Sequence, residues 1–306
     1  MKTNVIVGAS AVGSAVASLL AERGENVRLV TRRGGGPTHP LIERIAANAA
    51  DANRLSTIAE GAAALFNCAN PAYDRWLIDW PPISAATLKA AERSGAVLAT
   101  HATLYPYGPG SGVMTEATPL AATHPKLRLR GEMWRNALEL HQAGRIRATE
   151  IRASDHIQPQ SLVSLAMFRP MLAGKRVMSP VLVDVPRTWT SIRDAARLLT
   201  MVAADERAWG KAWHVPSHDP MTARELLTKF AKANGLPEPR LSVIPWSVIW
   251  AVGIFAPLIR EIRTTRYQFT QPFIMDSRLA RETFGMQPEP LEMALRDAAQ
   301  MMRTLG

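Results

Sequence analysis

The first 33 residues constrain the fold more than any other part of the chain. A short apolar run, 5–7, leads into Gly8-Ala9-Ser10-Ala11-Val12-Gly13, and a helix-like stretch continues over 12–23. This order predicts a strand, a tight turn and a helix whose first backbone N–H groups face an anion. Gly8 would make the turn, and Gly13 would let the helix pack closely against the strand. The pattern is typical of a pyrophosphate-binding turn in a dinucleotide site.

Ser10 stands where such turns usually carry a middle glycine, which lets the backbone approach the phosphates. Serine is small and donates a hydrogen bond of its own, so a phosphate contact is still expected. A glycine turn alone is a weak signal, because any tight entry into a helix favours glycine. The residues expected to contact the pyrophosphate are Gly8, Ser10, Ala11, Val12 and Gly13.

A second strand is expected over 26–30, after Gly24 at the position of a helix C-cap. NAD sites often place Asp or Glu at the end of this strand to hold the ribose hydroxyls, but the chain has Thr31, Arg32 and Arg33 there. Guanidinium groups bind oxyanions through paired hydrogen bonds, which suits a 2′-phosphate. We therefore expect NADP(H) in preference to NAD(H); the alternative is that both arginines are a solvated loop pair.

Composition limits the class of protein. The 306 residues are 47% hydrophobic and 20% charged, as in a folded soluble protein. The single cysteine, Cys68, excludes an internal disulfide framework, and no signal peptide is recognised, so we expect a cytoplasmic protein. The net charge of +10 is densest over 126–152, a region with few aromatics and no nucleic-acid-binding motif. An anionic cofactor or substrate explains this charge more simply than a nucleic-acid partner.

Apolar stretches alternate with helix-like ones beyond the first turn. Strands are expected over 63–68, 96–100 and 146–153, and helices over 83–94 and 128–143. This alternation predicts an α/β fold over 1–153, with a doubly wound, Rossmann-like parallel sheet. Prolines interrupt the pattern afterwards, so 154–306 are expected to form a smaller, mainly substrate-facing region with segments that return to the sheet. Helices are expected there over 222–234 and 291–305.

Residues 243–259 are apolar almost throughout, and Arg260, Arg263 and Arg266 follow them. The segment contains prolines and is at the short limit for crossing a bilayer of ~30 Å. We expect a buried helix or a substrate-covering lid. The alternative is a helix that makes peripheral contact with a membrane.

A series of segments in a specific order carries a family resemblance. They are the N-terminal turn, Asn67-Cys68-Ala69-Asn70-Pro71, Thr103-Leu104-Tyr105-Pro106-Tyr107-Gly108, Thr115-Glu116-Ala117-Thr118-Pro119-Leu120, Arg152-Ala153-Ser154-Asp155 and Trp189-Thr190-Ser191-Ile192-Arg193-Asp194-Ala195-Ala196. Over nearly its whole length, the chain resembles the NAD(P)-dependent epimerase/dehydratase family, the extended and atypical short-chain dehydrogenase/reductases. The resemblance implies a sheet that binds the dinucleotide and a C-terminal part that closes over a nucleotide sugar or another small carbonyl compound.

The resemblance also implies individual contacts. Asp51 matches the acidic position near the adenine. The loop that runs along the cofactor is matched by Cys68, Ala69, Asn70 and Pro71. Thr103 falls where the family has the Ser or Thr that hydrogen-bonds the reacting carbonyl, the alternative being a strand-end hydroxyl that satisfies the backbone.

The chain departs from the family at the catalytic pair, which is a tyrosine followed four residues later by a lysine. Tyrosines occur only at positions 73, 105, 107 and 267, and none has a lysine at that spacing. Counted back from Glu132, the pair falls at His124 and Arg128, and a shifted register gives Lys126 and Arg130. Histidine moves protons near neutral pH, whereas arginine would hold the ribose. The alternative is a basic, solvated loop and helix start.

Tyr105 is a further candidate proton donor because it follows the cofactor-facing strand, although a buried tyrosine often needs only a hydrogen-bond partner. We expect no metal site, because Pro216 separates His214 from His218 and spoils a helical pair of ligands. A serine-hydrolase elbow is not expected either, because no Gly-x-Ser-x-Gly occurs.

These observations favour an enzyme: an NADP(H)-dependent oxidoreductase or epimerase-like protein that acts on a small carbonyl or hydroxyl compound. Because the Tyr-Lys pair is missing, the alternative is a non-catalytic NADP(H)-binding sensor or interaction protein. A membrane-associated reductase is a third hypothesis. The sequence identifies neither the substrate, the reaction direction nor the oligomeric state.

Overall fold

The N-terminal segment forms the strand, turn and helix that the glycine spacing predicts. The computed structural model describes residues 2–159 and 162–304. β1 (Thr3–Val7) leads into α1 (Ala11–Glu22), and β2 (Asn26–Thr31) then pairs with β1 in parallel. Gly24, at φ +79°, lies between α1 and β2, so the chain reverses where the sequence predicts the end of a helix.

A sheet of seven strands has the order β12-β7-β5-β4-β1-β2-β3, and all the pairs from β7 to β3 are parallel. Its other strands are β3 (Ile42–Ala46), β4 (Ala64–Asn67), β5 (Val97–Thr103), β7 (Arg147–Ala153) and β12 (Ala212–His214). This order is that of a doubly wound dinucleotide-binding sheet, which confirms the predicted fold class. The strand order reverses between β1 and β4, and ligands of such sheets bind beyond the carboxyl ends of the strands at that point.

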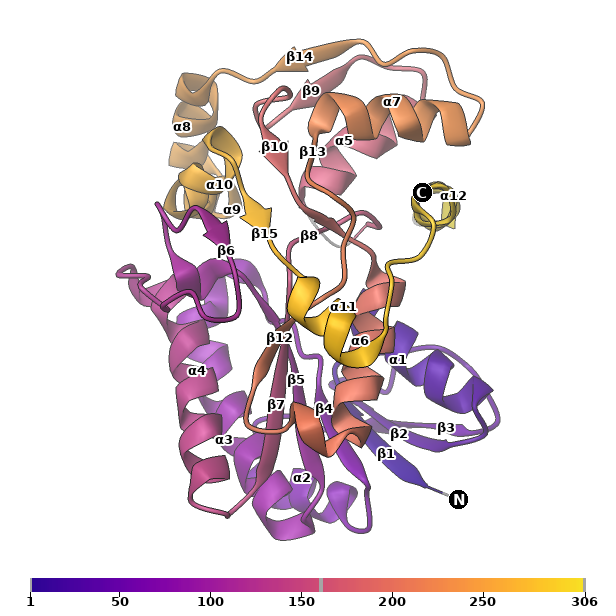
Figure 1. Ribbon diagram of the computed structural model, residues 1–306, viewed down its shortest axis with the longest axis vertical. Helices are drawn as coiled ribbons and strands as arrows, with labels where there is room; N and C mark the ends of the chain where they lie inside the picture. Colours follow the sequence, from indigo (N-terminus) through magenta and orange to yellow (C-terminus); the bar gives the residue numbers. More distant parts are fainter. Residues whose placement is uncertain (1, 160–161, 305–306) are drawn as a thin grey trace. The chain divides into compact units, whose positions relative to one another are not determined.

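Helices cover both faces of this sheet. They are α2 (Ala52–Ala59), α3 (Trp76–Ser94), α4 (Pro125–Gln142) and α6 (Ile192–Ala204), with one-turn helices at Tyr73–Arg75, Tyr105–Tyr107 and Glu206–Ala208. Figure 1 shows α3 and α4 on one side of the strands and α1 and α6 on the other. Buried side chains such as Val5, Leu65, Leu98 and Trp134 fill the space between the sheet and its helices.

α3 begins at Trp76 and not near the start of the expected range 83–94, and it continues through two prolines. Those prolines cannot donate hydrogen bonds to the carbonyls of Leu77 and Ile78, but these two residues are 52% and 63% exposed, so water is available to both carbonyls. Trp76 and Trp80 are buried on the other side of the same turns. Packing of these two rings therefore outweighs the local cost of the prolines.

The chain divides into two compact units, neither of which is one continuous stretch. The first unit comprises Met1–Pro106, Leu120–Ala153 and Ala195–Trp213, and it contains the sheet just described except for His214, the last residue of β12. The second comprises Tyr107–Pro119, Ser154–Asp194 and His214–Gly306.

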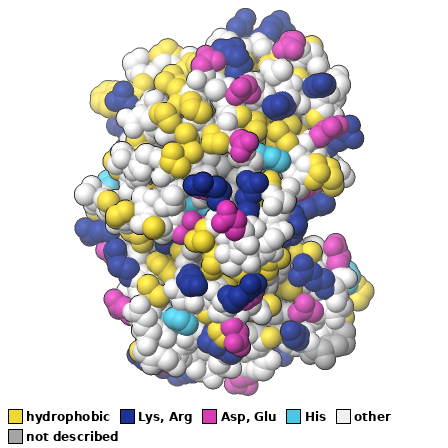
Figure 2. All heavy atoms as spheres, viewed as in Figure 1, with side chains coloured by type: hydrophobic (Ala, Val, Ile, Leu, Met, Phe, Trp, Pro, Cys, Tyr) yellow, Lys and Arg dark blue, Asp and Glu magenta, His cyan; other side chains and the backbone are white. Residues whose placement is uncertain are grey.

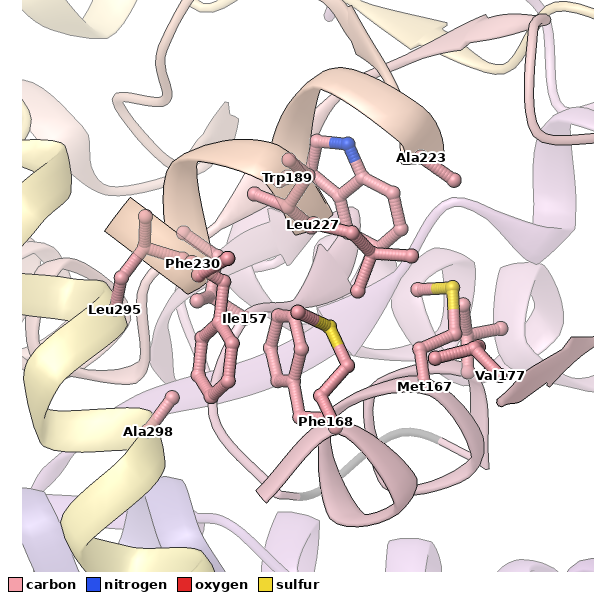
Figure 3. Packing of buried hydrophobic residues seen from close by; sticks show 14 of the residues in the cluster. Ile157, Met167, Phe168, Val177, Trp189, Ala223, Leu227, Phe230, Leu295 and Ala298 are labelled. Atoms are coloured by element: carbon pink, nitrogen blue, oxygen red, sulfur yellow. The ribbon is translucent and has the colours of Figure 1, made fainter. Parts of the chain in front are cut away.

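Short strand pairs and helices build the second unit. Its strands are β6 (Val113–Met114), β8 (Asp155–His156), β9 (Val177–Ser179), β10 (Pro186–Arg187), β11 (Trp189–Thr190), β13 (Met221–Thr222), β14 (Leu241–Val243) and β15 (Ile274–Met275). Its helices are α5 (Leu162–Leu172), α7 (Ala223–Ala233), α8 (Trp246–Phe255), α9 (Pro257–Ile262), α10 (Arg266–Thr270), α11 (Arg278–Phe284) and α12 (Leu291–Thr304), with one further turn at Arg263–Thr265. In the core of this unit, Phe168 stacks on Phe230 at a centroid separation of 4.2 Å, close to Ile157 and Trp189 (Figure 3).

The sequence predicts two helices of this unit well. Thr222 and Glu225 form a reciprocal capping box at the start of α7, which confirms the capped helix expected over 222–234. α12 confirms the expected terminal helix up to Thr304, and position 305 lies outside the described residues.

The apolar stretch 243–259 does not form a buried helix, so that expectation is wrong. α8 and α9 divide it at Ala256, which has φ −115° and ψ 101° because the residue before a proline disfavours the helical conformation. Only Ile249 and Gly253 of α8 are buried. A covering role for this segment stays a prediction. Within the described part of the chain, no helix combines the length and apolar character needed to cross a membrane.

Candidate functional site

The turn between β1 and α1 has no room for side chains at its two glycines. Gly8 has φ +96°, and a Cβ there would lie 2.7 Å from the carbonyl oxygen of Cys68. A Cβ on Gly13 would lie 2.1 Å from the carbonyl oxygen of Gly8. Glycine is therefore required at both positions by close backbone packing, as a dinucleotide-binding turn needs.

Ser10 is the N-cap of α1, and its Oγ accepts a hydrogen bond from the N–H of Gly13 at 3.1 Å. The hydroxyl proton of Ser10 is still able to point away from the helix towards an anion. Ala11 and Val12 begin the helix, and N–H groups in a first turn have no acceptor within the helix. The residues present therefore fit a pyrophosphate group at this helix N-terminus.

The loop after β2 presents its two arginines to solvent. The hydroxyl of Thr31 accepts a hydrogen bond from the N–H of Gly35 at 2.9 Å and donates one to the Gly35 carbonyl at 3.2 Å. This contact closes a turn with Arg32 and Arg33 in its exposed part. The charge of Arg32 helps, after the larger effect of Arg75, to lower the pKa of Asp79. Both guanidinium groups are thus accessible at the edge where a ribose phosphate would be held.

Asp51 serves as the N-cap of α2. Its Oδ1 accepts hydrogen bonds from the N–H groups of Asn53 and Arg54 at 3.1 and 3.0 Å. The structure therefore accounts for this carboxylate by helix capping, a role that the family resemblance does not reveal. The expected contact of Asp51 with adenine stays a prediction.

The loop after β4 runs from Asn67 to Pro71 and lies directly beside the glycine turn. A Cβ on Gly8 would clash with the backbone of Cys68 and Ala69 in this loop. Burial raises the pKa of the Cys68 thiol to about 12, so this residue is not a nucleophile at neutral pH. Asn70 is exposed and Ala69 is partly so. The loop thus offers backbone and small side chains along the predicted cofactor path, and it ends where Trp76 Nε1 donates to the carbonyl of Pro71 at 3.2 Å.

Thr103 is the last residue of β5, and its neighbour Tyr105 lies in the one-turn helix that follows. The Thr103 Oγ1 is buried and has no hydrogen-bond partner among the described residues. The alternative interpretation, that this hydroxyl satisfies nearby backbone, is therefore not supported by the hydrogen bonds of the structure. An unsatisfied buried hydroxyl at a strand end is suited to a ligand oxygen.

The exposure of the side chains on α4 distinguishes the two registers that the sequence leaves open for the catalytic pair. His124 is the exposed N-cap of this helix, where its side chain accepts from the N–H of Lys126. Arg128 has a side chain that is 53% exposed and pairs with Glu132 at 2.8 Å. Lys126 and Arg130, by contrast, are only 2% and 4% exposed. The buried pair is thus the shifted register, and the catalytic roles expected for His124 and Arg128 stay predictions.

Lys126 and Arg130 pack against aromatic rings that sequence reasoning missed. The Nζ of Lys126 lies 3.7 Å from the ring centroid of Tyr73, and the Cζ of Arg130 lies 4.2 Å from that of Trp80. These distances fit cation–π contacts. The ring of Trp76 lies 5.7 Å from that of Tyr105. We call Tyr73, Trp76, Trp80, Tyr105, Lys126 and Arg130 the aromatic–cation cluster; the available signal was the four-residue spacing of the two tryptophans and of the two cations.

Buried charges surround Arg130. Its Nη2 donates to the carbonyl of His101 at 3.0 Å. Burial lowers the pKa of Arg130 to about 10, an effect that the charges of Glu150 and Tyr105 oppose. Burial raises the pKa of Glu150, which the charges of Arg152, at 2.8 Å, and Arg130 counteract. Arg130 therefore remains a cation at neutral pH, close enough to Tyr105 for their charges to interact.

His214, considered above as a metal ligand, instead takes part in a hydrogen-bonded chain. In the second unit its Nε2 lies 2.6 Å from the hydroxyl of Tyr107, and its Nδ1 lies 2.7 Å from the carbonyl oxygen of Asp276. Over residues 2–159 and 162–304, no group of three or more His, Cys, Asp or Glu side chains is arranged to hold a metal ion.

Comparison with known proteins identifies the fold. No protein-family model matches the chain, and no curated protein does. A dTDP-glucose 4,6-dehydratase from Bacillus anthracis in complex with NAD is 15% identical, with a TM-score of 0.77 over 99% of this chain and 97% of that one. A UDP-glucuronic acid 4-epimerase from Bacillus cereus in complex with NAD is 14% identical, with a TM-score of 0.78 over 99% and 97%.

A third structure of the same fold is a UDP-glucose 4-epimerase from Thermotoga maritima with UDP-glucose. It is 16% identical to this chain, with a TM-score of 0.78 over 99% of both chains. At such low identities the likeness is one of fold. The chain therefore has, over almost its full length, the fold of dehydratases and epimerases solved with NAD or a nucleotide sugar.

Proposed function

We propose that the chain is an NADP(H)-dependent oxidoreductase or epimerase-like enzyme that acts on a small carbonyl or hydroxyl compound. The observation that carries this proposal is the β1–α1 turn, where close packing excludes a Cβ at both Gly8 and Gly13. The turn lies in a sheet of dinucleotide-binding order, and two proteins of the same fold were solved in complex with NAD. Binding and catalysis by this chain are the two parts of the proposal.

The preference for NADP(H) rests on the loop after β2. Arg32 and Arg33 are both exposed, and positions 31–36 contain no carboxylate that would hold free ribose hydroxyls. A 2′-phosphate carries negative charge to this point, and arginine binds phosphate oxygens in pairs. The dehydratase and the UDP-glucuronic acid 4-epimerase named above were solved in complex with NAD, so the proposed preference for NADP(H) rests on this chain's own loop.

The proposed chemistry uses the end of β5 and the aromatic–cation cluster. When bound, the nicotinamide supplies or accepts a hydride. Thr103 donates a hydrogen bond to the oxygen of the reacting carbonyl, because its buried Oγ1 has no other partner within residues 2–159 and 162–304. Tyr105 transfers a proton to that oxygen on reduction and removes it on oxidation, and the cation of Arg130 stabilises the negative charge left on the phenol oxygen.

The test is turnover of cofactor by purified protein with a panel of aldehydes, ketones and nucleotide sugars, followed by nicotinamide absorbance. Thr103→Ala and Tyr105→Phe should each lower kcat by about tenfold to a hundredfold or more while NADPH still binds. Thr57→Ala is the matched control, because that hydroxyl is exposed and donates to the carbonyl of Asn53 within α2. Unchanged turnover in both site variants would overturn the assignment of these residues.

The second candidate function is a non-catalytic NADP(H)-binding sensor, favoured by the lack of any tyrosine with a lysine four residues later. It shares the glycine turn and the arginine pair with the enzyme but needs no proton donor. NADPH binding without cofactor turnover across the whole panel, together with a stable protein partner, would favour the sensor. Turnover with any substrate would eliminate it.

A further inference from the structure

α8 displays an apolar surface that its own unit does not cover. Five large side chains of this helix are exposed, and they are Val248, Trp250, Val252, Ile254 and Phe255, the last of them to 88%. In Figure 2, hydrophobic side chains with Lys and Arg among them lie in the upper left of the view, where Figure 1 places α8 and α9. A helix with apolar residues on all sides is normally buried in protein or in lipid.

The helix is held in a defined hairpin with α9. A Cβ on Gly253 would lie 2.9 Å from the Nη2 of Arg263 and 3.1 Å from the backbone N of Arg260, so α8 and the chain that follows it are in close contact. Arg263 also donates a hydrogen bond to the carbonyl of Trp250. The apolar side chains are therefore presented by a packed hairpin that also carries Arg260 and is held by Arg263.

Positive charge and tryptophan adjoin the apolar surface. The Cζ of Arg263 lies 4.8 Å from the ring of Trp250, and that of Arg266 lies 5.2 Å from the ring of Trp246. Positions 241–270 contain three arginines and a single acidic residue, Glu261. Tryptophan and arginine are both suited to the boundary between hydrocarbon and water, and the net positive charge complements anionic headgroups.

The arrangement of the exposed side chains favours lipid over a protein partner. At about 100° per residue, the five positions from Val248 to Phe255 spread over roughly 200° of the helix circumference. A partner protein would have to enclose the helix on several sides, whereas acyl chains surround an inserted helix without a shaped groove. Because the helix has 10 residues and is about 15 Å long, it is too short to span a bilayer.

We propose that the α8–α9 hairpin is a peripheral membrane-docking element, which inserts Val252, Ile254 and Phe255 into the headgroup and acyl boundary of a bilayer that contains anionic lipid. Arg260 and Arg266 contact the headgroups. Because one short apolar insertion gives only weak binding, the apolar and the charged contributions are both needed. Binding is therefore reversible and depends on ionic strength.

Co-sedimentation of the full chain with vesicles tests this. Wild-type protein should bind phosphatidylcholine vesicles that contain phosphatidylglycerol, and should bind pure phosphatidylcholine or vesicles in high salt at least about tenfold more weakly. Val252→Ser combined with Phe255→Ser should lower the partition coefficient by about tenfold or more. Arg260→Gln combined with Arg266→Gln should remove the preference for anionic vesicles.

Matched controls lie in the same unit. Leu279 is 47% exposed on α11, and Leu279→Ser should bind vesicles as wild type does. Arg303→Gln removes an exposed charge elsewhere and should keep the preference for anionic lipid. Equal thermal unfolding of all variants shows that each is folded.

Wild-type protein that stays in the supernatant with anionic vesicles would overturn the proposal. So would serine variants that bind as wild type does. If light scattering instead shows a wild-type dimer that Phe255→Ser converts to monomer, without vesicle binding, the surface joins two copies of the chain and the proposal is wrong.

Discussion

A methyl group at position 13 should disrupt the turn on which the proposed cofactor site depends. In Gly13→Ala the new Cβ would lie 2.1 Å from the carbonyl oxygen of Gly8, and ordinary contacts begin near 3.4 Å. The other neighbour, the Cβ of Cys68, is 3.0 Å away and blocks movement of the helix to that side. The first turn of α1 or the Gly8 peptide must therefore move by about 1 Å or more.

The magnitude follows from two opposing effects. Alanine gains about 1 kcal/mol over glycine in the interior of a helix. Overpacking against backbone costs about 3 kcal/mol, the upper end of the usual range, because neither neighbour is a flexible side-chain end. The net loss is about 2 kcal/mol in the free energy of unfolding, which lowers Tm by about 4–8 °C. NADPH should bind at least about tenfold more weakly, since the N–H groups that face the pyrophosphate are displaced.

Calorimetric or spectroscopic thermal unfolding and NADPH titration measure both effects. Gly35→Ala is the control for stability, because a Cβ there meets nothing within 4 Å and the backbone does not have a positive φ. This variant should keep or slightly raise Tm. If Gly13→Ala unfolds at the wild-type temperature and binds NADPH as tightly as wild type, this turn does not depend on the close backbone packing at position 13.

Two further predictions concern buried charges. Arg130→Met should lower the free energy of unfolding by about 3 kcal/mol in chemical denaturation, because Glu150 loses a nearby cation and the His101 carbonyl loses its donor. The control is Arg128→Met, two residues away but exposed, which should change the free energy of unfolding by about 0.5 kcal/mol or less. Similar losses in the two variants would contradict a stabilising role for the buried Arg130. Burial lowers the pKa of His156 to about 4, below the 6.5 of an unfolded chain, so the unfolded state binds more protons between these values and stability falls as pH falls from about 6.5 to about 4. Between pH 7 and pH 5, the free energy of unfolding should fall by about 2 kcal/mol more in the wild-type protein than in His156→Gln. Equal pH dependence of the free energy of unfolding in the two proteins would show that His156 is not a buried neutral imidazole.

The sheet could be predicted from the sequence where local rules decide. Glycine spacing, a helix end at Gly24 and apolar runs identify β1, α1, β2, β4 and β7. β3 was not predicted because it is an edge strand in which Glu43, Arg44 and Ala46 are exposed, so it has no apolar run. In the second unit, β6 forms by pairing of Val113 with Ile274 and of Met114 with Met275, which no local pattern reveals.

The candidate site was only partly predictable for a related reason. The glycine turn and the arginine pair are local features, so sequence spacing was sufficient to find them. The face of α4 that is buried depends on which residues meet the sheet and α3, so counting back from Glu132 in the sequence left two registers open. The structure buries Leu127, Gly131 and Trp134, which fixes Lys126 and Arg130 on the buried side. The prediction that 243–259 form a buried helix was wrong because apolar composition does not determine which other parts of the protein cover a helix.

We propose that this chain holds NADP(H), with the glycine turn on the pyrophosphate and Arg32 and Arg33 on the 2′-phosphate. The decisive measurement is calorimetric titration with NADPH and with NADH, on wild type and on Arg32→Ala combined with Arg33→Ala. Wild type should prefer NADPH by at least about tenfold, and the double variant should lose about tenfold to a hundredfold in NADPH affinity with little change for NADH. Equal affinity of wild type for both cofactors, or an equal loss for both in the variant, would contradict the claim.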